Sequence, residues 1–171
     1  MLKKVLLVLV LGLIFSTQAY SQSFLIGPQV GYYKAKDADE GDFLFGGAAR
    51  LKFSSLGVEA SINYRQEKYA DGAVKVTTYP VMLSGMLYVL PVAYGVAGIG
   101  WYNYKYEAFG MEESGSDIGY HIGGGAEISL GSIVLSGDIR YVFLKYQFED
   151  SGMGDQEANF YVITGSVLFP L

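Results

Sequence analysis

The chain has 171 residues, of which 51% are hydrophobic and only 17% are charged, and this composition excludes a disordered protein. It contains no cysteine, so disulfides, thiolate metal sites and a lipid-modified cysteine are excluded. The net charge of −5 argues against a general nucleic-acid binder, which needs a basic surface. The 23 glycines and 15 tyrosines, beside only 4 prolines, favour a fold of many strands that turn often.

Residues 1–21 have the pattern of a secretory signal peptide. Lys3 and Lys4 precede an apolar run over residues 5–15, and small residues at 17, 19 and 21 fit a cleavage site. The run is shorter than the roughly 20 residues that a bilayer-spanning helix needs. We therefore predict a cleaved signal peptide over 1–21 and one domain over 22–171, with an uncleaved anchor as the alternative.

The rest of the chain has a hydropathy period of two, which predicts strands. Short links at 54–56, at 91–92 and around Gly131 alternate with longer polar links at 35–42, 108–116 and 148–156 and a tighter one at 70–72. This alternation is typical of an up-and-down barrel in which neighbouring strands pair antiparallel. Eight strands are expected, at about residues 24–34, 43–53, 57–69, 74–90, 93–107, 117–130, 132–147 and 157–169.

Alternation alone leaves open which face of the barrel is outside, because a soluble lipocalin-like barrel would turn its apolar face inward. The interior of an eight-stranded barrel is just wide enough to be filled by side chains. The apolar faces carry too many aromatic rings for that space, whereas the polar faces hold glycine, alanine, serine and a few charges. We therefore predict a transmembrane barrel whose apolar face contacts lipid.

The same assignment predicts two aromatic girdles at the membrane interfaces. Near the short turns they would comprise Phe24, Phe53, Tyr94 and Phe169, and near the longer links Tyr32, Phe43, Tyr64, Tyr79, Tyr104, Tyr120, Phe143 and Tyr161.

Charged residues on the polar faces would point into the lumen, where unpaired charge is costly. Neighbouring strands suggest that Arg50 pairs with Glu59, and that Arg140 bridges Glu127 and Asp138. A packed, structural lumen is favoured, with a narrow gated path as the alternative. The predicted structural network comprises Arg50, Glu59, Arg65, Glu127, Asp138 and Arg140, with Lys52 and Glu67 on the same faces.

No catalytic, cofactor or metal site is predicted. His121 is the single histidine, has no serine close to it in sequence and falls on the lumen face, so a packed histidine is favoured over a catalytic one. The acidic run at 37–42 has some features of a calcium loop, but Ala48 stands where the closing glutamate belongs. A solvated acidic loop is favoured, with weak divalent-cation contact left open as the alternative.

Four segments carry a resemblance to a known family: 79–83, 94–100, 123–127 and 138–141. They resemble the eight-stranded outer-membrane β-barrel family that includes the OmpA transmembrane domain and OmpX. The resemblance implies a Gram-negative outer membrane location and a charged, packed core. As partners it implies outer-membrane lipid, lipopolysaccharide and the barrel-assembly machinery. That family usually ends its last strand in an aromatic residue, whereas here Pro170 and Leu171 follow Phe169.

The favoured function is a structural or surface-interaction role for a small, non-enzymatic outer-membrane barrel. The first alternative is a narrow porin-like protein that transports small solutes or hydrophobic molecules. A lipid A-modifying enzyme is a further alternative, opposed by the inward position expected for His121.

Overall fold

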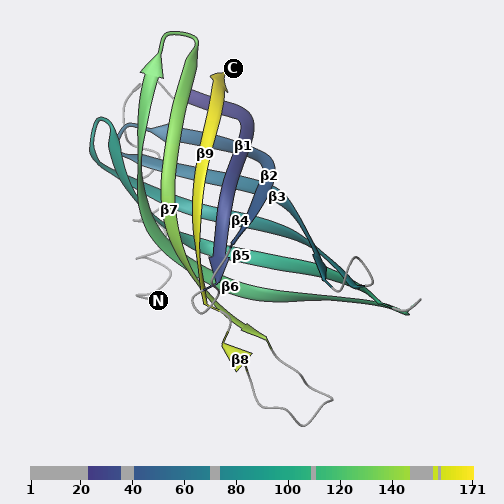
Figure 1. The fold of residues 1–171 in the computed structure, drawn as a ribbon. Helices are drawn as coiled ribbons and strands as arrows, with labels where there is room; N and C mark the ends of the chain where they lie inside the picture. Colours follow the sequence, from purple (N-terminus) through teal and green to yellow (C-terminus); the bar gives the residue numbers. More distant parts are fainter. Residues whose placement is uncertain (1–22, 36–40, 70–73, 109–110, 147–155, 158) are drawn as a thin grey trace, which may run out of the picture.

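The computed structural model describes residues 23–35, 41–69, 74–108, 111–146, 156–157 and 159–171, and the signal-peptide prediction lies outside these ranges. Eight long strands form one antiparallel sheet that curls into a barrel (Figure 1). Within the described ranges, no helix is long and apolar enough to cross a membrane. The strands are β1 (Ser23–Ala35), β2 (Asp42–Phe53), β3 (Leu56–Tyr69), β4 (Val74–Leu90), β5 (Ala93–Ala108), β6 (Met111–Leu130), β7 (Ile133–Tyr146) and β9 (Phe160–Pro170), with a two-residue β8 (Gln156–Glu157) paired to the end of β7.

The sheet closes on itself because β1 pairs with both β2 and β9, while β7 pairs with both β6 and β9. Every one of these pairings is antiparallel. The tight turns that follow β2, β4 and β6 lie at the same end of the barrel as the end of β9, which we call the turn side (Figure 1). The opposite end is the loop side. The predicted eight-stranded, antiparallel, up-and-down barrel is confirmed.

One predicted link is wrong. Residues 108–116 were expected to form a long loop, but β5 runs to Ala108 and β6 begins at Met111. Cross-strand pairing continues from Asn103 with Ser116 out to Ala108 with Met111. The segment is polar because its strands extend past the apolar band, and polarity alone cannot distinguish such an extension from a loop.

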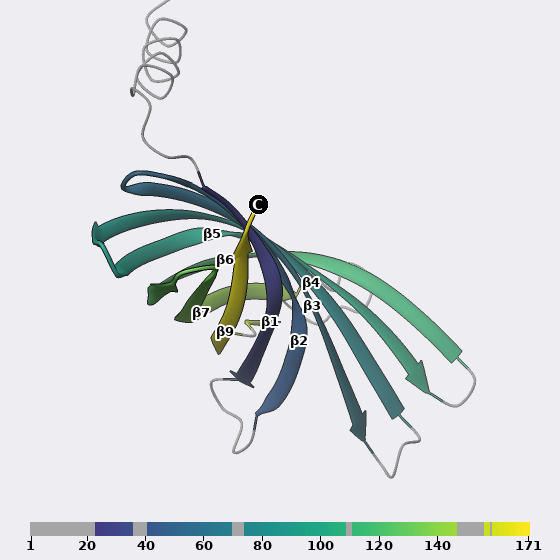
Figure 2. The same cartoon turned by 90° about the horizontal axis from the view of Figure 1, so that it is seen from above.

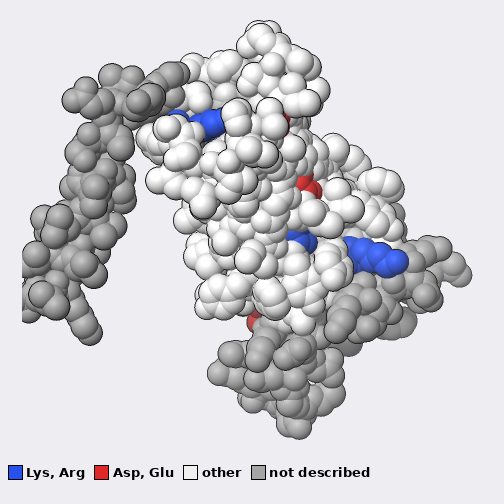
Figure 3. All heavy atoms as spheres, turned by 90° about the vertical axis from the view of Figure 1, so that its left-hand side faces the viewer, with Lys and Arg blue, Asp and Glu red and all other residues white. Residues whose placement is uncertain are grey.

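The outer face of the barrel is apolar and the inside is charged. Phe45, Ile62 and Ile139 on the outer face are 59%, 56% and 50% exposed, whereas inward-facing Arg50 and Glu127 are 0% and 4% exposed. On the face drawn in Figure 3, few described spheres belong to charged residues. This arrangement rules out the soluble-barrel alternative, because a water-soluble barrel would bury its aliphatic side chains and expose its guanidinium groups.

Some of the rings predicted for the girdles lie on the outer face. Tyr32 contacts Phe43 edge-on, Tyr64 packs against Tyr79, and Tyr141 lies against both Phe143 and Tyr161. Other exposed rings are Tyr120 on the loop side and Phe24, Phe53 and Phe169 on the turn side.

The strand predicted at 93–107 is present as β5, but the girdle positions predicted for Tyr94 and Tyr104 on it are wrong. Tyr94 is buried inside the barrel, and Tyr104 lines a cavity at the loop-side mouth of the lumen. Tyr102, on the same face of β5, is also buried inside. The opposite face of β5 carries Ile99 and Trp101, so both faces of this strand are apolar and hydropathy could not decide between them.

Inward-facing glycines make room for these rings and for the polar lumen side chains. A Cβ on Gly119 would lie 2.9 Å from the ring of Tyr102, and one on Gly125 would lie 2.7 Å from the ring of Tyr94. A Cβ closer than 3.0 Å to another heavy atom forces a shift, so these rings occupy space that only glycine leaves open.

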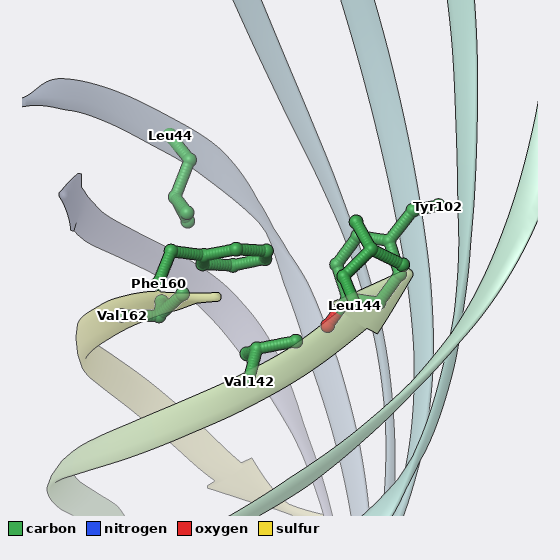
Figure 4. Close-up of a cluster of buried hydrophobic side chains, with 6 residues drawn as sticks. All are labelled: Leu44, Tyr102, Val142, Leu144, Phe160 and Val162. Carbon is green, nitrogen blue, oxygen red and sulfur yellow. The ribbon is translucent and has the colours of Figure 1, made fainter. Parts of the chain in front are cut away.

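Apolar clusters lie on both sides of the polar interior. The loop-side cluster, which β2, β5, β7 and β9 contribute, is drawn in Figure 4, where its side chains lie inside the barrel. On the turn side of the polar interior lie two smaller clusters, one around Leu25 and Leu168 and the other around Met86 and Tyr94. The loop-side cluster comprises Leu44, Tyr102, Val142, Leu144, Phe160 and Val162, with Tyr33 packed against it.

Candidate functional site

The lumen holds one connected network of charges. We define the charge network as Arg50, Lys52, Glu59, Glu127, Asp138 and Arg140, which the salt bridges link into a single group of three cations and three anions.

Arg50 is the centre of the network. Its Nη2 and Nε donate to Glu59 Oε2 at 2.5 and 3.0 Å, and its Nη1 donates to Glu127 Oε2 at 2.7 Å. The Nη2 group also reaches the hydroxyl of Ser136 at 3.2 Å. Because the Arg50 side chain is fully buried, these hydrogen bonds replace the water that its guanidinium group lost on folding.

Arg140 forms the second half of the network from β7. Its Nε donates to Asp138 Oδ1 at 2.7 Å and its Nη2 to Asp138 Oδ2 at 2.9 Å. The same Nη2 donates to Glu59 Oε1 at 2.6 Å, and Nη1 donates to Ser84 Oγ at 3.1 Å. Glu59 is therefore shared, one oxygen with Arg140 and the other with Arg50.

The turn-side end of the network is covered by Lys52 and Tyr88. Lys52 Nζ lies 2.5 Å from Glu127 Oε1 and 3.9 Å from the centre of the Tyr88 ring. The Tyr88 hydroxyl donates to Glu127 Oε2 at 2.8 Å. Both carboxylate oxygens of Glu127 thus accept hydrogen bonds, and the Lys52 ammonium group and the Tyr88 ring cover the carboxylate on the turn side.

Two expectations for the charge network are not met: the pairing of Arg140 with Glu127, and the membership of Arg65. Arg50 does pair with Glu59, but Arg140 bridges Asp138 to Glu59 instead of to Glu127. Arg65 stands near the loop-side mouth, with its guanidinium group 3.9 Å from the centre of the Tyr33 ring. The Glu67 side chain lies outside the described residues.

Several polar partners were missed because they are neutral and lie on distant strands. Ser84, Ser136 and Thr164 each bond to a network residue, and the Tyr94 hydroxyl donates to Asp138 Oδ2 at 3.1 Å. The only sequence signal for them is their polarity at inward-facing strand positions, which many other residues share.

His121 is buried and lies 2.9 Å, through Nε2, from the hydroxyl of Ser84 on β4. No serine lies near His121 in the sequence, but the fold brings Ser84 of β4 into contact with it. The pair is enclosed in the lumen, since both side chains are nearly fully buried and Ser84 also accepts a hydrogen bond from Arg140.

The described residues include no group of three or more His, Asp or Glu side chains that could hold a metal ion. The acidic run at 37–42, which has some features of a calcium loop, lies mostly outside the described residues, since only Gly41 and Asp42 are described.

A second feature lies at the loop side, where β3 to β6 run past the rest of the barrel (Figure 2). We define the sheet extension as Arg65–Tyr69 of β3, Val74–Thr78 of β4, Tyr104–Ala108 of β5 and Met111–Ile118 of β6. Among the described residues, β6 pairs with β7 only from Gly119 onward, so Met111–Ile118 has a ladder partner on its β5 side alone.

A closed antiparallel barrel with aliphatic residues outside and an ion network inside defines a transmembrane β-barrel of the outer-membrane type. The family profile described as "Outer membrane protein beta-barrel domain" matches residues 5–168, and the chain belongs to this family. The protein is accordingly an outer-membrane barrel protein. No curated protein matches the chain in sequence.

Several solved structures share the fold. Neisserial surface protein A is 13% identical with a TM-score of 0.67, over 89% of this chain and 100% of that one. A major outer membrane protein from Thermus thermophilus is 12% identical with a TM-score of 0.60, over 89% of this chain and 100% of that one. The N-terminal β-barrel domain of Pseudomonas aeruginosa OprF is 12% identical with a TM-score of 0.53, over 88% of this chain and 100% of that one.

Proposed function

We propose that this protein is a non-enzymatic surface-interaction barrel, which binds an extended segment of an external partner along the open edge of its sheet extension. The observation that carries the proposal is the edge of β6 at Met111–Ile118, whose backbone pairs on one side only among the described residues. An open strand edge offers a row of backbone donors and acceptors to another strand. Native proteins usually pair, cover or blunt such edges, so an open one is a candidate binding surface.

The orientation follows from the family architecture. Outer-membrane barrels have short turns on the periplasmic side and longer loops on the outside, which would direct the sheet extension into the medium. We include in the proposal export through a cleaved signal peptide over residues 1–21, insertion by the barrel-assembly machinery, and contact of the loop side with lipopolysaccharide.

The chemistry of the edge favours a basic partner. The segment Met111–Ile118 contains Glu112, Glu113 and Asp117 and no basic residue. An extended peptide with alternating lysine and valine residues would add both backbone hydrogen bonds and opposite charge.

The test uses the full barrel refolded in nanodiscs and an immobilised peptide of alternating lysine and valine. The matched variant replaces residues 104–115 by Asn-Gly, which joins the paired residues Asn103 and Ser116. It also replaces residues 66–77 by Asn-Gly, which joins the paired residues Arg65 and Thr78, so that no unpaired edge is left on β4. Pairing of β6 with β7 begins beyond the first cut, at Gly119, so closure of the barrel is retained. Gel mobility of unboiled against boiled samples verifies that the variant is folded.

Strand addition predicts binding to the intact barrel and binding at least tenfold weaker for the shortened variant. It also predicts slower amide hydrogen exchange over Met111–Ile118 when the peptide is present. Equal binding by both barrels, or no binding by the intact one, would contradict the proposal.

The packing of the lumen favours a surface-interaction role over transport through the barrel. The charge network lies between the apolar clusters, and the full burial of Arg50 and Arg140 in it favours a closed lumen. We expect no stable ion channels in planar bilayers, and a reproducible conductance would favour the narrow-pore alternative.

A further inference from the structure

His121 ends a chain of hydrogen bonds that starts at the charge network. Arg140 Nη1 donates to Ser84 Oγ at 3.1 Å, and the same hydroxyl lies 2.9 Å from His121 Nε2. A Cβ on Gly98, the residue that pairs with both Ser84 and His121, would lie 2.8 Å from that nitrogen. The imidazole ring therefore leans across β5 towards β4, and glycine at position 98 lets it do so.

The donors and acceptors along this chain determine where the histidine proton lies. Arginine can only donate, so Ser84 Oγ accepts from Arg140. The other partner of the Ser84 hydroxyl is His121 Nε2. If Nε2 accepts, the single O–H of Ser84 donates to it. Were Nε2 to donate instead, the serine proton would have no acceptor among the described residues. A neutral ring that accepts at Nε2 carries its proton on Nδ1.

That Nδ1 atom is buried and has no hydrogen-bond partner among the described residues. The same holds for both amide atoms of Gln29, the hydroxyl of Ser61 and both amide atoms of Asn63. All four side chains are at least nine-tenths buried, and buried polar groups in native proteins are paired with protein or with ordered water.

The strand pairings place these groups between the charge network and the loop-side cluster. His121 contacts Ser84, which is bonded to the network, and pairs with Val142, a member of that cluster. Along β3 the inward-facing residues run from Glu59, in the network, through Ser61 and Asn63 towards the loop side. The Asn63 amide extends over Gly46, where a Cβ would lie 2.6 Å from Asn63 Oδ1, and Gln29 pairs with Gly46 from the other side.

We propose that this part of the lumen is a binding site for ordered water, in which neutral His121 donates its Nδ1–H to a water molecule held with the help of Gln29, Ser61 and Asn63. A water molecule can donate and accept, which suits a set that contains an N–H donor, a hydroxyl and two amides. The apolar cluster on its loop side and the charge network on its turn side would retain this water.

The test exploits the fact that the chain has a single histidine, so its imidazole gives one set of nitrogen signals. Long-range proton–nitrogen correlation spectra of the refolded barrel, labelled with nitrogen-15 histidine, report which ring nitrogen is protonated. The expected result is protonation at Nδ1 and a rotating-frame cross-peak between that proton and water.

Two variants separate this arrangement from a merely packed histidine. Ser84→Ala removes the donor to Nε2, and the preference for the Nδ1–H form should be lost, whereas Ser84→Thr retains a hydroxyl and should retain the preference. Protonation at Nε2 in the unsubstituted barrel, or an Nδ1 proton without a water cross-peak, would overturn the proposal. The spectra of the unsubstituted barrel decide the matter even if Ser84→Ala does not fold.

Discussion

Removal of the Arg140 guanidinium group should destabilise the barrel more than removal of a cation outside the network. The side chain is fully buried and makes four hydrogen bonds, two to Asp138, one to Glu59 and one to Ser84. In Arg140→Ala, Glu59 keeps only Arg50, and Asp138 keeps only the neutral donors of Thr164 and Tyr94. Breaking a buried ion pair from one side costs about 3–5 kcal/mol, and we expect a loss of that size in the free energy of unfolding.

The assay is urea unfolding of the barrel refolded in lipid vesicles, followed by the fluorescence of Trp101. This is the only tryptophan in the chain, and its side chain is partly exposed on the outer face, so it passes from lipid to water on unfolding. Lys34→Ala is the control, because Lys34 is an exposed cation near the loop-side end of β1. A substitution at an exposed position away from buried contacts usually changes the free energy of unfolding by about 0.5 kcal/mol or less.

A second variant separates the effect of charge from that of lost packing. In Arg140→Met combined with Asp138→Asn, one cation and one anion leave together, so the network keeps equal numbers of each. Replacing a buried pair as a unit is much less costly than breaking it, so the double variant should lose less than the sum of the losses for Arg140→Met and Asp138→Asn measured singly. A loss below about 1 kcal/mol for Arg140→Ala, or strict additivity in the double variant, would refute the reasoning.

Other predictions follow from the two faces of the barrel. Gly98→Val should destabilise by about 1–3 kcal/mol in the same urea assay, because its Cβ would meet the Leu83 carbonyl oxygen at 2.1 Å, whereas Gly95→Ala, with nothing within 4 Å, should be tolerated. Equal stability of these two variants would mean that the inward glycines are not required for packing. Ile139→Lys, on the outer face, should cost about 2–4 kcal/mol in vesicles, and no loss there would be inconsistent with contact between this face and lipid.

The period of two predicted the strands and which residues share a face, because successive side chains of a strand point to opposite sides. On β6 and β7 one face is consistently apolar, and the structure places Ile122 and Ile139 outside and Glu127 and Arg140 inside. Polar residues inside a narrow barrel and aliphatic residues outside could be inferred from the side-chain volumes alone.

The sequence was insufficient where both faces of a strand have the same character. On β5 a tyrosine can lie in lipid or, with its hydroxyl bonded, in a polar lumen, and only the presence of Ser136 and Asp138 opposite Tyr94 decides for the lumen. The polar end of β6 cannot be distinguished from a loop by its sequence for a similar reason, since a strand outside the membrane has no apolar face to reveal it.

By itself the sequence determined that the chain forms a barrel, that its charges are enclosed and that its outer surface is lipid-like, since each of these follows from local alternation and composition. Only the tertiary structure decided which charges meet. Arg50 reaches Glu127 across 77 positions of the chain and Arg140 reaches Glu59 across 81, because closure of the barrel brings distant strands face to face. The physical reason is that strand pairing is set by local patterns, whereas contacts across the lumen depend on the tilt, register and volume of all eight long strands together.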